Sequence, residues 1–118
     1  MNTIIFGDGN LGRAIAAALR VAGTEPRILG RPAEDRHVPT AIGSADLVFE
    51  VSRGDAVRSN VESALAAGCR RFVIGTTGWE AERPAVDRSL REARLSLLSE
   101  LRNRIFELGD ISMVTVKK

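Results

Sequence analysis

Short apolar runs alternate with longer amphipathic stretches over most of this chain. The apolar runs cover residues 3–6, 27–29, 45–51 and 71–74, and runs this short suit strands buried on both faces of a sheet. Between the first and second runs, and between the third and fourth, apolar residues recur at helical spacing. Strands that alternate with helices in this way imply right-handed crossovers and a parallel sheet. The pattern therefore predicts an α/β fold, a parallel sheet with helices on both faces.

Local signals give expected bounds for the helices and for the loop between them. The first helix should stop near Gly23, and we expect one apolar stripe of it to face the core: Leu11, Ile15, Ala18, Leu19 and Ala22. Asp55 can cap the second helix, which should run to about Ala67. Residues 33–43 are polar and include Pro39, which predicts a loop.

The last third of the chain has a different pattern. Residues 84–108 predict one long, charge-rich helix, and residues 111–116 alternate like a strand. Four apolar positions of that helix form a heptad-like seam: Leu98, Leu101, Ile105 and Leu108. The seam can pack on the sheet, or it can pair with a second chain. Two heptads do not decide between these alternatives.

Composition limits the size and the partners of the protein. A chain of 118 residues with 44% apolar residues suits a single domain with one core. The net charge is +2, and the basic residues are scattered arginines apart from Lys117 and Lys118. Scattered arginines are typical of solvated helix faces, so we expect no nucleic-acid partner. Cys69 is the only cysteine, and a small buried thiol is its expected role.

Targeting and membrane signals are absent from the sequence pattern. The N-terminus leads directly into the first strand, and no basic stretch followed by an apolar run predicts a signal peptide. No apolar run approaches the length needed to cross a bilayer. We therefore expect a cytoplasmic protein with no membrane partner.

A glycine-rich loop connects the first strand to the first helix. Residues 7–12 read GDGNLG, and a G-x-G-x-x-G run between a strand and a helix predicts dinucleotide binding in a Rossmann-like domain. Gly7 should permit the tight turn, Gly9 should let a pyrophosphate approach, and Gly12 should let the helix pack closely. The helix N-terminus would face the phosphates. The alternative is a glycine turn that binds no ligand.

The end of the second strand bears on the choice of cofactor. An acidic residue there accepts hydrogen bonds from the ribose of NAD, whereas an arginine accommodates the 2′-phosphate of NADP. Here Gly30 takes the place of the acid and Arg31 follows it, and a guanidinium can bind a phosphate with two hydrogen bonds. We therefore expect NADP(H) to be preferred and NAD(H) to remain usable. The alternative is an exposed loop arginine.

Two further segments carry a resemblance to a known family. Residues 46–57, then Asn60, then the segment 73–79 with the sequence VIGTTGW, resemble the dihydrodipicolinate reductases. That family reduces a cyclic intermediate of lysine biosynthesis with NADPH or NADH. The resemblance covers about residues 1–94, which we expect to be an NAD(P)-binding domain. Residues 95–118 have no recognised counterpart and would pack on this domain or mediate homo-oligomerisation.

The resemblance implies a set of cofactor-binding residues. The glycine loop would hold the pyrophosphate, and Arg31 would hold the 2′-phosphate. The ends of the third and fourth strands would line the nicotinamide and its ribose. The full candidate set is Gly7, Asp8, Gly9, Asn10, Leu11, Gly12, Arg31, Val51, Ser52, Gly75, Thr76 and Thr77. Thr76 and Thr77 could instead form a capped turn without a ligand.

The sequence also departs from this family. Family members use histidines and a lysine of a second domain for substrate binding and proton transfer. This chain has one histidine, His37, which we expect in a surface loop, and its two lysines end the sequence. We therefore predict no catalytic residue and no metal site, and whether the chain is an enzyme stays open. The alternative function is a non-catalytic interaction module that dimerises through residues 95–118.

Overall fold

A four-stranded, all-parallel sheet forms the centre of the protein in a computed structural model that describes residues 1–31 and 42–108, with side chains as far as Ser99. Its strands are Thr3–Phe6 (β1), Arg27–Leu29 (β2), Leu47–Glu50 (β3) and Phe72–Ile74 (β4). The helices of the described part are Asn10–Val21 (α1), Val57–Ala66 (α3) and Arg83–Leu108 (α4), with a short 3₁₀ turn at Glu80–Glu82 (η1). The predicted α/β fold is confirmed.

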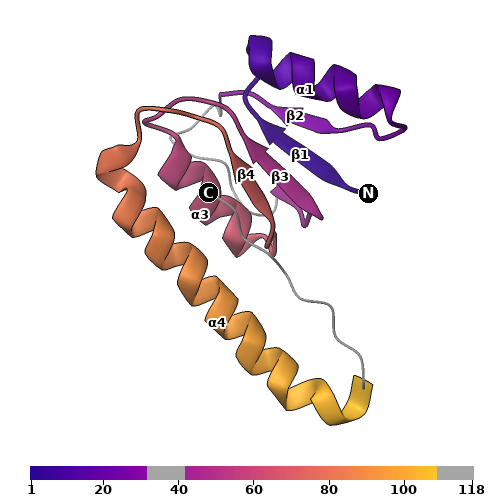
Figure 1. Ribbon diagram of the computed structural model, residues 1–118, viewed down its shortest axis with the longest axis vertical. Coiled ribbons are helices and arrows are strands. Elements are labelled where there is room, and N and C mark those ends of the chain that lie inside the picture. The colour runs from indigo at the N-terminus through magenta and orange to yellow at the C-terminus, as the bar shows by residue number, and fades with distance from the viewer. Residues whose placement is uncertain (32–41, 109–118) are drawn as a thin grey trace.

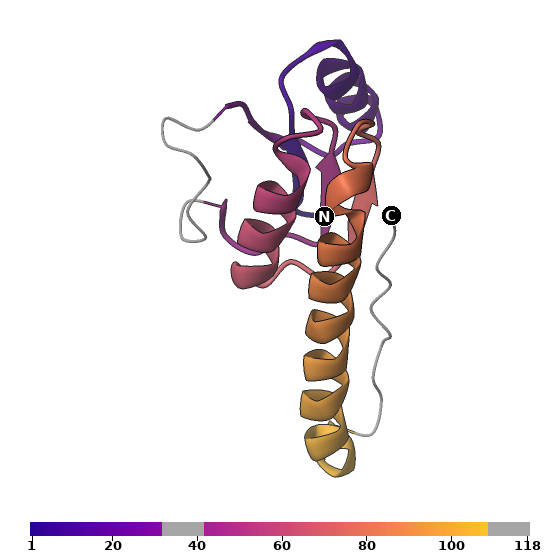
Figure 2. The ribbon, with the colours of Figure 1, turned by 90° about the vertical axis from the view of Figure 1, so that its left-hand side faces the viewer.

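The strand order places helices on both faces of the sheet. The order is β2-β1-β3-β4, so the crossover from β1 to β2 and the crossover from β3 to β4 run in opposite directions. Because both crossovers are right-handed, α1 and α3 lie on opposite faces (Figure 1). The long helix α4 lies beside α3 on the second face (Figure 2). The direction of winding thus reverses between β1 and β3, where open α/β sheets bind ligands.

The core lies between the sheet and the pair of helices α3 and α4. Ile4, Val48 and Phe72 form one row across the sheet, and all three side chains are fully buried. They pack against apolar residues of the helices: Val57, Val61, Ala64, Val86 and Leu90. Trp79, which follows β4, joins this core and has the Arg83 guanidinium 5.1 Å from its ring centroid.

The predicted core stripe of α1 is wrong in part. Its buried residues are Gly12 and Ala16, whereas Leu11 is 54% exposed. Ile15 and Leu19 of the predicted stripe are half-buried, but Ala18 and Ala22 are exposed. A Cβ on Gly12 would lie only 2.0 Å from the carbonyl oxygen of Gly7. The close approach at Gly12 therefore turns the small side chains, rather than the largest ones, toward the sheet.

The ends of α3 correct one prediction and confirm another. The N-cap is Ala56 without a side-chain hydrogen bond, so the predicted cap at Asp55 is wrong. The Asp55 carboxylate lies instead 3.3 Å from Nε of Arg53. Beyond the other end of α3, Cys69 is fully buried as predicted, and this burial raises the pKa of its thiol.

The predicted C-terminal helix is confirmed as far as its backbone. It begins one residue earlier than expected, and it continues without a break past Arg94, where the family resemblance ends. Of the apolar seam, only Leu98 has a described side chain, and it is half-buried. The predicted strand at 111–116 and the loop with His37 lie outside the described residues. No helix in the described part of the chain could cross a membrane.

Candidate functional site

An open cleft lies at the carboxyl edge of the sheet, beside the point where the winding reverses. Its volume is about 750 Å³, which falls within the usual range for small-molecule and cofactor sites. The segments that follow β1, β2 and β3, together with the start of α3, form its walls. The lining residues are Gly7, Asp8, Gly9, Leu29, Gly30, Arg31, Val51, Ser52, Arg53, Asp55, Ala56, Ser59 and Asn60.

The glycines of the loop after β1 have different physical reasons to be glycine. Gly7 has a φ of 122°, and a Cβ on it would lie 2.5 Å from the carbonyl oxygen of Val51. A Cβ on Gly12 would collide with the carbonyl oxygen of Gly7. Gly9 has a φ of −80°, which any residue can adopt, and a Cβ there would meet nothing within 4 Å. Neither backbone strain nor packing within the described chain requires glycine at position 9.

The N-terminus of α1 lies at Gly9. Gly9 is the N-cap, no side chain caps the helix, and the first turn carries no acidic residue. The first backbone bond into the helix runs from the N–H of Arg13 to the carbonyl of Gly9. Uncapped N–H groups and the helix dipole favour an anion at such an end. The start of α1 is therefore suited to a phosphate group that approaches across Gly9.

A fully buried carboxylate lies behind Ser52 and Asn60, two residues that line the cleft. Glu50 is the last residue of β3 and lies in register between Phe6 and Ile74. Its Oε1 accepts hydrogen bonds from the backbone N–H of Ser52 at 2.8 Å and from the Ser52 hydroxyl at 2.6 Å. Its Oε2 accepts one from Nδ2 of Asn60 at 2.7 Å. These donors replace the water that a buried carboxylate loses.

Thr76 connects this carboxylate to the segment after β4. Its hydroxyl oxygen lies 2.9 Å from Oε1 of Glu50 and 3.1 Å from the Glu50 carbonyl oxygen. Glu50 therefore holds together the ends of two neighbouring strands and the first turns of α3. A second contact between the same segments is backbone against backbone, because a Cβ on Gly54 would lie 2.4 Å from the carbonyl oxygen of Gly78.

The structure groups half of the predicted site residues in the cleft. Those that line it are Gly7, Asp8, Gly9, Arg31, Val51 and Ser52; those that do not are Asn10, Leu11, Gly12, Gly75, Thr76 and Thr77. Asn10 and Leu11 form the first turn of α1, and Gly12 packs beneath the loop. Gly75 lies against Val51, with its Cβ position 3.2 Å from Cγ1. Thr77 is exposed.

The family resemblance includes Glu50 and Asn60, but neither is in the candidate set of cofactor-binding residues. Glu50 carried one signal, because it interrupts an otherwise apolar strand on the same face as Val48. Asn60 and Ser59 come from α3 and line the cleft, and of the two only Asn60 is part of the resemblance. The buried hydroxyl of Ser59 has no hydrogen-bond partner within the described part of the chain.

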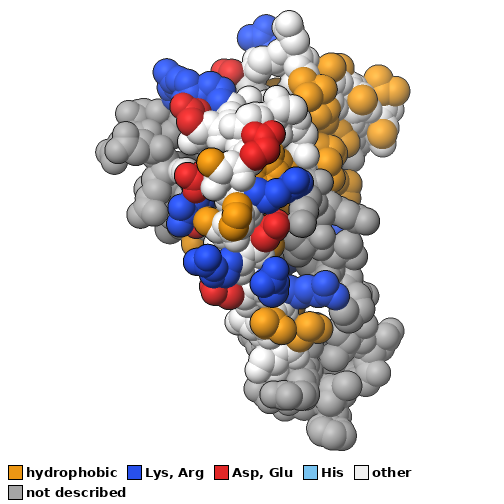
Figure 3. Space-filling view, turned by 60° about the vertical axis from the view of Figure 1, so that its left-hand side comes forward, with side chains coloured by type: hydrophobic (Ala, Val, Ile, Leu, Met, Phe, Trp, Pro, Cys, Tyr) orange, Lys and Arg blue, Asp and Glu red, His pale blue; other side chains and the backbone are white. Residues whose placement is uncertain are grey.

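Candidate metal ligands and surface charge also bear on what the described residues could bind. Among residues 1–31 and 42–99, no cluster of three His, Cys, Asp or Glu side chains could hold a metal ion. On the face shown in Figure 3, basic and acidic side chains are intermixed, and Arg58 pairs with both Glu62 and Glu82.

A comparison of the sequence with models of known protein families finds no match.

Proposed function

We propose that this chain binds a nicotinamide dinucleotide in the cleft at the carboxyl edge of its sheet. The observation that carries the proposal is Gly9, where neither backbone strain nor packing requires glycine and which lies at a helix N-terminus without a side-chain cap. A ligand that must approach the backbone closely supplies the missing reason. The pyrophosphate of a dinucleotide is such a ligand, since it carries charge and needs short contacts to backbone N–H groups.

The residues that line the cleft indicate where the other parts of the cofactor would bind. Arg31 lies at the end of β2 and lines the cleft, so it can bind the 2′-phosphate of NADP(H), the cofactor that we propose as preferred. The nicotinamide and its ribose would lie toward Val51 and Ser52, and Glu50 holds Ser52 through two hydrogen bonds.

The reaction class rests on the resemblance to the dihydrodipicolinate reductases. It favours hydride transfer in lysine biosynthesis, with this domain as the cofactor half of a cytoplasmic reductase. No histidine or lysine lies in the described part of the chain, so the groups that bind the substrate carboxylates would come from elsewhere. Adding a histidine-containing substrate domain in trans and following cofactor oxidation would test this role.

Calorimetric titration of the purified chain with NADPH and with NADH tests the binding proposal. We expect binding of both cofactors, with NADPH bound more tightly because of Arg31. A hydrogen bond to a charged group contributes about 1.5–3 kcal/mol, so Arg31→Ala should weaken NADPH binding by about tenfold or more and leave NADH binding nearly unchanged. A folded chain that gives no heat with either cofactor would contradict the proposal.

One observation favours a second candidate function, an interaction module. Leu95 on α4 is 59% exposed, and Figures 1 and 2 show that α4 extends well past the sheet and past α3. A large exposed apolar side chain on a projecting helix is suited to pairing with another chain. In that case the protein would dimerise through residues 95–118, and cofactor binding would be absent or incidental.

A further inference from the structure

The carboxylate of Asp8 lies where a side chain of residue 30 would begin. A Cβ built on Gly30 would be 2.7 Å from Oδ2 of Asp8 and 3.3 Å from its Cγ. Both residues line the cleft, next to Leu29 and Arg31. The space beyond the end of β2 is therefore filled by an acidic group that belongs to the loop after β1.

The register of the sheet explains how Asp8 reaches this position. Phe6 is paired with Leu29, and the N–H of Gly7 donates a hydrogen bond to the carbonyl of Leu29 at 3.0 Å. The next residues on the two segments, Asp8 and Gly30, consequently leave the sheet side by side. Because Gly30 has no side chain, the Asp8 carboxylate can occupy the space above it.

An acidic side chain at the end of β2 has a defined role in dinucleotide-binding domains. It accepts hydrogen bonds from the adenosine ribose of NAD(H), and its charge opposes the 2′-phosphate of NADP(H). The sequence lacks that acid, because residue 30 is glycine. In the structure, however, a carboxylate is present at the same end of β2.

We propose that Asp8 replaces the missing acid of β2 and determines cofactor choice together with Arg31. This inference rests on the proposed binding of a nicotinamide dinucleotide in the cleft. Asp8 accepts a hydrogen bond from the ribose hydroxyl of NAD(H) and repels the 2′-phosphate of NADP(H). Arg31 attracts that phosphate, so the two side chains act in opposite directions. The preference for NADP(H) is therefore smaller than Arg31 alone would give, and NAD(H) stays usable.

Calorimetric titration of the full chain and of the variant Asp8→Asn with NADH and NADPH tests the inference. Asparagine keeps the shape of the side chain and removes its charge. We expect the ratio of the NADH to the NADPH dissociation constant to rise by about tenfold or more, since a hydrogen bond to a charged group is lost and a repulsion is removed. Arg31→Ala should change the same ratio in the opposite direction.

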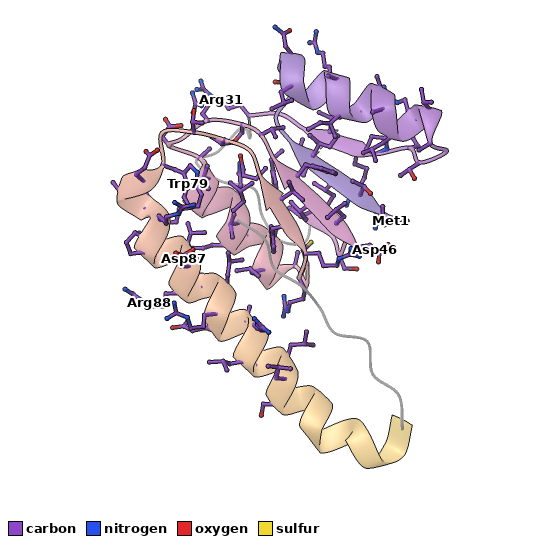
Figure 4. The ribbon with its side chains drawn as sticks, viewed as in Figure 1. Met1, Arg31, Asp46, Trp79, Asp87 and Arg88 are labelled. Atoms are coloured by element: carbon purple, nitrogen blue, oxygen red, sulfur yellow. The ribbon has the colours of Figure 1, made fainter. Side chains whose placement is uncertain are left out.

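Asp46→Asn is the matched control for the change in charge. Asp46 precedes β3 at the opposite end of the strands from Arg31, as Figure 4 shows, and it should not alter the ratio. If the wild-type chain binds both cofactors and Asp8→Asn leaves the ratio unchanged, the role of Asp8 is wrong while the proposed function stands. If neither the wild-type chain nor Asp8→Asn binds either cofactor, the proposed function itself fails.

Discussion

At the scale of single residues, Glu50 is the least expected feature of the molecule. It occupies a core position of β3, between Phe6 and Ile74 across the sheet, and it is fully buried. An apolar residue at this position would pack well, but it could not hold Ser52, Asn60 and Thr76 in one place. The buried carboxylate thus takes the place of an apolar core side chain and fixes the positions of these three residues at the edge of the cleft.

Glu50→Ala should destabilise the fold strongly. The change leaves the donors of Ser52, Asn60 and Thr76 without their shared acceptor, and each buried unpaired donor costs about 1–3 kcal/mol. We expect the free energy of unfolding, measured by urea denaturation, to fall by about 3 kcal/mol or more. Glu25→Ala is the control, because it removes an exposed ion pair with Arg20 and should cost less than about 1 kcal/mol. Equal losses in the two variants would show that the Glu50 network does not stabilise the fold.

The sequence predicted some of these residue-scale features and not others. The close packing of Gly12 and the tight turn at Gly7 follow from the glycine pattern, and the structure confirms both. The Glu50 network could not be predicted from the hydrophobic pattern, because Asn60 reaches Glu50 only when α3 packs on the sheet and Thr76 only when β3 and β4 pair. The contact between Asp8 and Gly30 was hidden for the same reason, since it depends on the register of β1 with β2.

At the scale of elements, the hydrophobic pattern predicted the type of each described helix and strand. The pattern did not predict which side of α1 faces the sheet. Periodicity identifies an apolar stripe on a helix, but it gives no distance between the helix and the sheet. Gly12 decides that distance, and small residues rather than Leu11 face the sheet as a result. The Asp55 cap was also wrong, because a capping residue type is a weak signal when an arginine two positions away competes for its carboxylate.

Helix α4 is much longer than α3, the helix that it packs against. It has 26 residues, about 39 Å of helix, whereas α3 has 10 residues, about 15 Å. More than half of α4 therefore lies beyond the reach of its partner helix. Leu95 stands in this part with most of its side chain exposed, and it is the position at which to test pairing with a second copy.

Leu95→Glu should shift the protein toward the monomer if α4 pairs with another chain. A buried charge at a helix interface costs several kcal/mol, so we expect the dimer to be lost at micromolar concentration in analytical ultracentrifugation. Ser96→Glu introduces the same charge at the neighbouring exposed position and should leave the mass unchanged. A wild-type chain that is already a strict monomer would remove the basis for the interaction module.

At the scale of the whole molecule, topology brings the site together. The strand order β2-β1-β3-β4 reverses the winding between β1 and β3, and the cleft opens beside this point with walls from both halves. The alternation of strands and helices was enough to predict a parallel sheet. It could not give the strand order, because the same alternation is compatible with several orders. Ser59, a cleft residue from α3, was therefore not predicted.

The proposed binding of a pyrophosphate across Gly9 predicts that Gly9→Ala weakens cofactor binding. Alanine is a poorer N-cap than glycine, so the variant should lose a little stability. Gly23→Ala is the matched control, because its positive φ also makes alanine mildly destabilising, yet it lies at the far end of α1 from the cleft. The measurement is the NADPH dissociation constant of the wild-type chain and both variants. We expect Gly9→Ala to weaken binding by about tenfold or more, as a lost charged hydrogen bond would, while Gly23→Ala binds like the wild type. Equal binding by all three proteins would show that no ligand approaches the backbone at Gly9.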